Sequence, residues 1–181
     1  MKRALLLALA FLGACAATQP ESDWERANRD RLGLQAPEAE APLPAYPKKE
    51  GLLEFYVSAT TDFKYFIDAG TLSVSPRQGI VRYVMVARSP SGVDNVSYES
   101  IHCPEEYRVL AVGDRGKWAS RPGDWRPIVK GTSTSWQYAL SRNYFCPHRD
   151  SIQTVAEGID ALRRGGHPAV TVDPYGKGGG S

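Results

Sequence analysis

The sequence predicts an α+β fold: an antiparallel β-sheet of about five to six strands, with C-terminal helices packed on it and one disulfide. Three observations lead to this prediction. From Leu52 onward, aromatic and β-branched runs alternate with turn residues, which is typical of strands. An amphipathic helical pattern occupies 151–166. Two cysteines, Cys103 and Cys146, lie far apart in the domain and are available to form a bridge.

The first residues have the pattern of an export signal. Lys2 and Arg3 precede an apolar run over 4–12, which is shorter than the roughly 20 residues that a membrane-spanning helix needs. The segment Leu12-Gly13-Ala14-Cys15 resembles the lipobox of bacterial lipoproteins, in which cleavage leaves the cysteine as a lipid-bearing N-terminus. We therefore expect a signal peptide over 1–14 and lipid, including palmitate, on Cys15.

A cysteine suits this position because a thiolate is nucleophilic enough near neutral pH to accept a diacylglyceryl group. The alternative is an ordinary signal peptide that happens to precede a cysteine. Ala16 and Ala17 follow Cys15, and no Asp is present there that would resemble an inner-membrane retention signal. We expect a cell-envelope protein that is anchored by lipid to the outer membrane, on its periplasmic or surface face.

Residues 15–50 are rich in proline, alanine and charge, and this composition predicts a tether. One exception is a capping-box pattern that starts at Ser22 and ends before Gly33, which predicts a short helix over 23–32. The folded domain is predicted over 51–175, followed by a flexible tail over 176–181.

The charge pattern argues against nucleic acid as a partner. The formal net charge of +2 equals the contribution of Lys2 and Arg3, so the chain after the predicted signal is neutral. Phosphate binding depends on clustered Lys and Arg, and the sequence has no basic run.

The pattern of strands predicts the centre of the sheet. The strands are expected over 52–58, 63–67, 71–75, 79–88, 94–102 and 106–113. In 79–88 both alternating sets of side chains are largely apolar, so this strand should be central and covered on both faces. The C-terminal helices are expected to provide that cover.

Two helices are predicted after the last strand. In 151–166 an apolar stripe follows helical spacing, Asp150 or Ser151 is available as a cap, and Gly165-Gly166 can end the helix. The stripe consists of Ile152, Val155, Ile159 and Leu162. The segment "TSWQYALSRNYFC" predicts a second, shorter helix that delivers Cys146, although its aromatic residues also suit a strand.

Cys103 and Cys146 are predicted to form a disulfide, because an exported protein folds where thiols are oxidised. The bridge would close a loop of about 44 residues and stabilise the fold by roughly 4 kcal/mol. Metal binding is an alternative, since His102 and His148 lie next to the two cysteines, but the spacing is not that of zinc ligands. Free thiols are a third alternative.

We find no catalytic motif in the sequence. The sequence lacks a nucleophile elbow, an H-E-x-x-H pair, a phosphate loop and a dinucleotide fingerprint, and nothing selects a carboxylate pair for glycan cleavage. A site formed by His102 and His148 is conceivable, although structural histidines are more common. We expect no enzymatic activity, no cofactor and no resident metal.

The most suggestive segment for binding is "GDRGKWASRPGDWRPIVKG". Trp118, Trp125, Arg121 and Arg126 are the candidate ligand-binding residues, because exposed rings and cations can stack on sugars or hold an acidic partner. The alternative is that both tryptophans are buried and close the open end of the sheet.

Several segments resemble the CNP-one-like family of proteobacterial envelope proteins: "FIDAGTLSV", "GIVRYVMVARSPSGVDNVSYESIHCPEEYRVLAVG", "KWASRPGDWRPI" and "YFCP". The resemblance covers about residues 50–147 and includes both cysteines and both tryptophans of the loop. It implies that Cys103 and Cys146 form the bridge and that the other shared positions are framework. The family pattern implies no catalytic role.

The segments "FIDAGTLSV" and "IHCPEEYRVL" are also similar to the surface adhesin E family, whose members bind host proteins. We therefore expect a non-catalytic module that binds an envelope or extracellular macromolecule. The alternative function is an enzyme or assembly factor that acts on peptidoglycan or another glycan.

Overall fold

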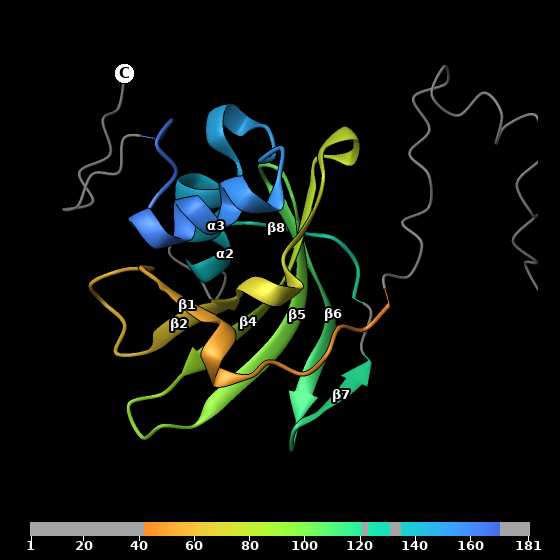
Figure 1. Ribbon diagram of the computed structural model, residues 1–181, viewed down its shortest axis with the longest axis vertical. Helices are drawn as coiled ribbons and strands as arrows, with labels where there is room; N and C mark the ends of the chain where they lie inside the picture. The colour runs from red at the N-terminus through yellow and green to blue at the C-terminus, as the bar shows by residue number, and fades with distance from the viewer. Residues whose placement is uncertain (1–41, 121–122, 131–134, 171–181) are drawn as a thin grey trace, which may run out of the picture. The chain divides into compact units, whose positions relative to one another are not determined.

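The computed structural model describes residues 42–120, 123–130 and 135–170 (Figure 1). The predicted signal peptide, Cys15, the helix expected over 23–32, Arg121 and the tail lie outside the described residues. The described residues include no helix long and apolar enough to cross a membrane.

Two long strands form the centre of the sheet. β4 (Ile80–Arg88) pairs with β5 (Asp94–His102) along its whole length, from Ile80 opposite His102 to Arg88 opposite Asp94. The turn between them is closed by the Ser89 carbonyl, which accepts from the Gly92 N–H at 2.9 Å, and by the Arg88–Asp94 ion pair at 2.6 Å. The strands predicted over 79–88 and 94–102 are confirmed.

The antiparallel sheet has eight strands within the described part of the chain, and its main path runs β1-β2-β4-β5-β6-β7. The flanking strands are β1 (Leu52–Phe55), β2 (Lys64–Asp68), β3 (Ser73–Ser75), β6 (Glu106–Asp114), β7 (Lys117–Ser120) and β8 (Arg126–Pro127). β3 lies against the first half of β4, while β8 and β7 pair with the start and the end of β6. Single turns of 3-10 helix, η1 (Lys49–Gly51), η2 (Ala69–Thr71), η3 (Pro76–Gln78) and η5 (Pro147–Arg149), link the elements.

The antiparallel sheet predicted from the sequence is therefore confirmed, but β7 and β8 were not predicted. β7 exists because a two-residue turn folds the chain back at once on β6. Arg115 and Gly116 both have positive φ, at 48° and 79°, which matches the twist of a tight hairpin. The run Asp-Arg-Gly-Lys contains the glycine that signals such a turn.

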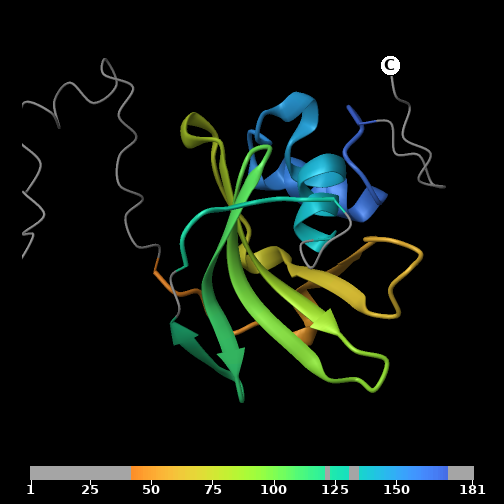
Figure 2. The ribbon, with the colours of Figure 1, turned by 180° about the vertical axis from the view of Figure 1, so that it is seen from behind.

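The two helices lie on one face of the sheet, as predicted (Figures 1 and 2). α2 (Ser135–Leu140) continues into the π-helical turn η4 (Ser141–Phe145), which places Cys146 beside the sheet. α3 (Val155–Arg164) ends at Gly165, whose φ of 75° allows a left-handed cap.

The predicted start of α3 is wrong. Thr154, not Asp150 or Ser151, caps the helix: its Oγ1 accepts from the Glu157 N–H at 3.1 Å. The Glu157 carboxylate in turn accepts from the Gln153 N–H at 2.6 Å, so a reciprocal box fixes the first turn. As a result Ile152 is buried but precedes the helix, and Val155 is 37% exposed rather than part of the apolar stripe.

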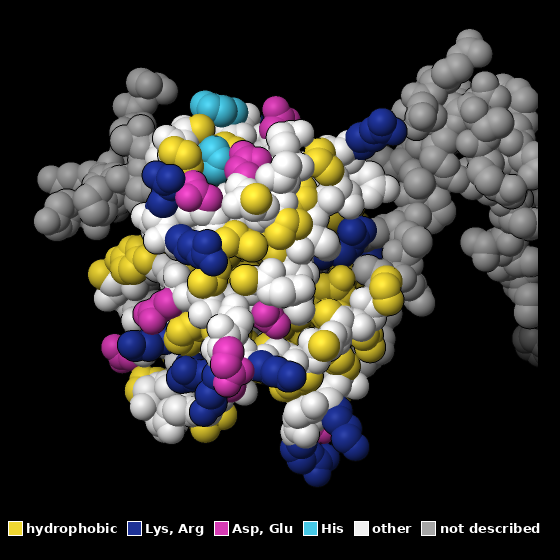
Figure 3. Space-filling view, viewed as in Figure 1, with side chains coloured by type: hydrophobic (Ala, Val, Ile, Leu, Met, Phe, Trp, Pro, Cys, Tyr) yellow, Lys and Arg dark blue, Asp and Glu magenta, His cyan; other side chains and the backbone are white. Residues whose placement is uncertain are grey.

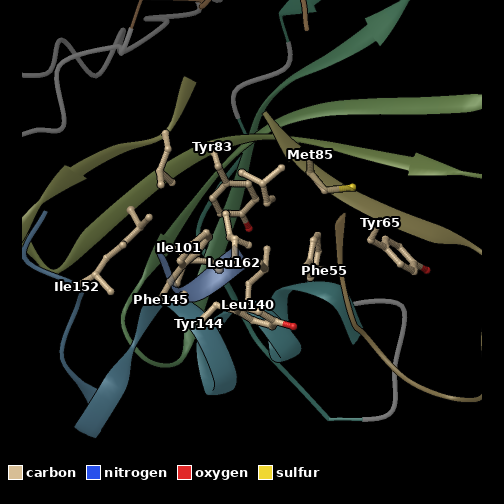
Figure 4. Packing of buried hydrophobic residues seen from close by; sticks show 14 of the residues in the cluster. Phe55, Tyr65, Tyr83, Met85, Ile101, Leu140, Tyr144, Phe145, Ile152 and Leu162 are labelled. Carbon is tan, nitrogen blue, oxygen red and sulfur yellow. The ribbon is translucent and has the colours of Figure 1, made fainter. Parts of the chain in front are cut away.

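The main core lies between the sheet and these helices (Figure 4). Tyr83 and Ile101, from β4 and β5, meet Phe145 and Leu162, from η4 and α3, and none of these side chains is more than 2% exposed. Tyr83 and Phe145 have ring centroids 5.6 Å apart. The burial of Tyr83 on this central strand fixes the helical layer in place.

The opposite face of the sheet, which we call the second face, is covered by non-helical segments in the described part of the chain. Its apolar side chains are Phe66, Val84, Val86, Val96, Tyr98, Leu110 and Ala111. Tyr46, Leu52 and Trp118 pack on them. β4 is thus covered on both faces, as predicted, but the expectation that helices supply all the cover is wrong. Residues 42–47, Pro-Leu-Pro-Ala-Tyr-Pro, here named the strap, approach this face before β1 begins (Figure 1).

Cys103 and Cys146 form the predicted disulfide, with an S–S distance of 2.08 Å. It joins the end of β5 to the end of η4, and so ties the helical layer to the sheet. The metal and free-thiol alternatives for this pair are wrong. Among the described residues, no group of three or more His, Cys, Asp or Glu side chains could hold a metal ion.

Gly158 in α3 is required by close packing. A Cβ at this position would lie 2.7 Å from Ile152 Cδ1 and 2.8 Å from Leu72 Cδ2. Gly158→Ala is therefore expected to lower the free energy of unfolding by about 1–3 kcal/mol, although alanine favours helix by about 1 kcal/mol. Urea denaturation would measure the change. A variant as stable as the wild type would show that α3 can move away from the sheet at no cost.

Candidate functional site

Trp118 lies on β7 and serves to attach the strap. Its indole Nε1–H donates to the Pro44 carbonyl at 2.8 Å. Its ring centroid lies 5.1 Å from that of Tyr46 and 6.4 Å from that of Tyr98. The side chain is half-buried. These contacts favour the structural alternative for this tryptophan.

Trp125 occupies a different part of the second face, beside the start of β6. Its ring lies 5.7 Å from the His102 ring, and the Arg108 guanidinium carbon lies 5.2 Å from the centre of the Trp125 ring. A cation placed this way is attracted by the electrons of the ring face. Trp125 is half-buried, so part of the indole remains open to a ligand.

The predicted group of candidate residues is not brought together. Arg126 pairs with Tyr107, a residue that packs on the helical side of the sheet, and neighbours along a strand point to opposite faces. Arg126 is exposed, but it lies on the other side of β8 from Trp125. Arg121 lies outside the described residues. The partners of Trp125 are thus Arg108 and His102, which sequence reasoning did not select as a pair.

A polar row crosses the second face next to Trp125. Arg82 on β4, Ser100 on β5 and Arg108 on β6 are direct neighbours in register. Arg82 Nη1 donates to Ser75 Oγ at 3.3 Å. Ser100 is fully buried, and its Oγ has no hydrogen-bond partner in the described part of the chain. The second face therefore has an apolar half under the strap and a cationic half that ends at Trp125.

A buried carboxylate, that of Glu99, lies on the face of β5 that the helices cover. Glu99 is 1% exposed and accepts four hydrogen bonds. Its Oε1 accepts from Ser97 Oγ at 2.6 Å. Its Oε2 accepts from Tyr83 Oη at 3.2 Å, Trp136 Nε1 at 3.2 Å and Gln137 Nε2 at 2.9 Å. The donors come from β4, β5 and α2, so the carboxylate connects the sheet to the first helix.

Burial raises the pKa of the Glu99 carboxyl above its usual range, against the opposing effect of the four hydrogen bonds. Burial, and then the nearby carboxylate, raise the pKa of Tyr83 well above its usual range. Neither group is open to a substrate, because each is at most 1% exposed. The network is a structural element of the core rather than an acid–base site.

The sequence of the chain matches one family of known proteins. The CNP1-like family model matches residues 34–163. The chain belongs to the CNP1-like family. Neither the curated proteins nor the solved structures contain a match. The family match includes the strap, both half-buried tryptophans of the second face and both bridged cysteines, and it confirms the resemblance seen in the sequence.

The histidines of this CNP1-like domain lie in three different surroundings within the described residues. His102 Nδ1 lies 3.2 Å from Glu106 Oε2, whereas His148 is exposed in η5. His167 is buried and bonds to Glu157 Oε1 at 2.9 Å, but its Nδ1 already accepts from the Ala169 N–H at 3.1 Å. A nitrogen that accepts a backbone hydrogen bond is not available as a general base.

In this CNP1-like protein Ser100 lies two residues before His102 on β5, so the two side chains are on the same face of the sheet. Its Oγ makes no hydrogen bond to the imidazole. A nucleophile activated by histidine needs that contact. The described face therefore combines aromatic rings with cations, and the Ser100 hydroxyl on it is not hydrogen-bonded to His102.

Stability should depend on pH through Glu99. The folded-state pKa is raised above an unfolded value of about 4.3, so the contribution of this group is fully present below that pH. It is lost as the pH rises through the folded pKa. Relative to Glu99→Gln, the wild type should lose free energy of unfolding as the pH rises above about 4. Urea titrations at a series of pH values would measure the free energy of unfolding of the wild type minus that of Glu99→Gln. An increase of this difference with rising pH would contradict the prediction.

Proposed function

We propose that this CNP1-like protein is a lipid-anchored, non-catalytic module that binds an envelope or extracellular macromolecule through the cationic half of its second face. The observation that supports the proposal is the half-buried Trp125 ring, which contacts both His102 and Arg108. The disulfide and the central strands hold these side chains on a rigid support. Preorganised rings and cations of this kind suit sugar rings or acidic groups.

The proposed anchor is the lipid on Cys15, at the end of the export signal over 1–14. One acyl chain holds a protein weakly, and further chains make its release negligible. Cys15→Ser should yield a protein that takes up no labelled palmitate and leaves the membrane fraction. Unchanged lipid labelling of the variant would refute the anchor.

The alternative function is action on peptidoglycan or another glycan, and one assay separates the two. The exported Cys15→Ser protein is incubated with purified peptidoglycan sacculi, then sedimented, and the supernatant is analysed for released fragments by mass spectrometry. Binding without release, weakened at least tenfold by Trp125→Ala, would support recognition of an envelope polymer. Release of fragments would overturn the non-catalytic proposal. The exposed Val155→Ala variant, remote on α3, is the matched control.

A further inference from the structure

The sequence of the strap favours the backbone of a recognition peptide over that of a strand. Proline stands at positions 42, 44 and 47, and each proline restricts its own φ and the conformation of the residue before it. Leu43 and Tyr46 are such preceding residues. A segment restricted in this way favours the polyproline II conformation, whose carbonyl groups point outward and accept hydrogen bonds from a partner.

The strap lies against aromatic and small residues of the second face. We name the surface formed by Val96, Tyr98, Gly113 and Trp118 the Trp118 groove. The Trp118 indole N–H donates to the Pro44 carbonyl at 2.8 Å, and the Tyr46 ring packs at 5.1 Å from the Trp118 ring. Indole donation to a carbonyl of a proline-rich segment, with the rings as walls, is a general mode of peptide recognition.

The floor of the groove is shaped for close approach. A Cβ on Gly113 would lie 2.5 Å from the Tyr46 hydroxyl oxygen and 2.9 Å from Val96 Cβ. The chain of β6 therefore leaves room for the tyrosine only because this residue is glycine. Gly113 thus accommodates a side chain of the strap and not an additional strand, because β6 remains paired with β5 and β7.

The outer side of the strap is open to solvent. Pro42, Leu43 and Ala45 are exposed, with Leu43 at 45%, and apolar side chains are visible where the segment crosses the sheet in Figure 3. The strap packs through Pro44 and Tyr46, and the strands pair with each other without it. It can therefore leave the groove without breaking the sheet.

We propose that the Trp118 groove is a binding site for proline-rich segments of a partner protein, and that the strap occupies it in cis and thereby inhibits it. This site is separate from the Trp125 end on which the proposed function rests. A segment attached to its own site competes at an effective concentration of roughly millimolar. A partner then binds strongly only when the strap is released.

The test uses the exported Cys15→Ser chain and a synthetic peptide of the strap, Ala-Pro-Leu-Pro-Ala-Tyr-Pro. Pro44→Ala combined with Tyr46→Ala empties the groove, and the indole N–H resonance of Trp118 reports binding by nuclear magnetic resonance. The emptied variant should bind the peptide saturably, at least tenfold more tightly than the wild type does. Trp118→Phe in the emptied variant, followed through the backbone N–H resonance of Gly113 because the indole signal is lost, should abolish binding.

A peptide in which alanine replaces the three prolines is the control for conformation, and it should bind at least fivefold more weakly. Absence of a saturable shift in an emptied variant whose sheet resonances are unchanged would overturn the proposal, as would equal binding of the proline-free peptide. A concentration-dependent dimer of the wild type that the emptied variant lacks would also overturn it, because the strap would then serve a second copy. If the double variant does not fold, Pro44→Gly, which loosens the strap and keeps Tyr46, supplies the same readout.

Discussion

Glu99→Leu is expected to lower the free energy of unfolding by about 3–5 kcal/mol. Leucine fills a similar volume but removes the acceptor of Tyr83 Oη, Trp136 Nε1 and Gln137 Nε2. Each buried donor that is left without a partner costs about 1–3 kcal/mol. Urea denaturation of the oxidised protein at pH 7 would measure the loss.

Glu99→Gln is the matched control for this experiment. Its side-chain carbonyl can accept from the same three donors, while its amide group can donate to Ser97 Oγ. We expect it to change the free energy of unfolding by about 1 kcal/mol or less. If the leucine variant were as stable as the glutamine variant, the network would not be what holds α2 on the sheet.

The second large effect is expected from the disulfide. Cys103→Ser combined with Cys146→Ser should lower the free energy of unfolding by about 4 kcal/mol, because the bridge spans a sequence separation of 43 and limits the unfolded chain. Denaturation of the double variant against the oxidised wild type measures this. The reduced wild type is a second reference, and it should match the variant. A loss below about 1 kcal/mol would contradict the view that loop closure dominates.

Much of the fold could be predicted from the sequence because buried positions in strands and helices recur at a regular spacing. β4 carries apolar side chains on both alternating sets, so its central place follows directly, and β5 was predicted with the bounds it has in the structure. The bridge followed from the number of cysteines and the expected compartment. β7 and β8 were missed because the segment that contains them, 113–131, is rich in Gly and Pro, which is typical of a loop.

The cover of the second face could not be predicted from composition. A proline-rich segment usually indicates a tether, and nothing in the sequence shows that Tyr46 finds a place over Gly113. Similarly, a glutamate in a strand such as Glu99 in β5 usually indicates a residue that faces solvent, so its burial could not be predicted from the sequence. Its burial depends on donors from α2, which lies 37 to 38 residues further along the chain.

The candidate site was predicted in part. Both tryptophans of the loop were selected, but their roles differ because they contact opposite ends of β6: Trp118 holds the strap and Trp125 meets Arg108. Arg126 was selected for its nearness in sequence, whereas strand alternation turns it away. Arg108 and His102 come from other strands, and only the register of the sheet brings them to Trp125.

The most direct test of the proposed binding face is photocrosslinking in intact cells. An aromatic photoreactive residue, benzoylphenylalanine, replaces Trp125, so that a ring is kept at this position, and in a control it replaces the exposed Val155 on α3. The captured material is then identified by mass spectrometry. We expect one specific envelope or extracellular macromolecule at position 125, absent at position 155 and lost when Arg108→Gln is combined with the position 125 probe. The same products from both positions, or none from position 125, would contradict it.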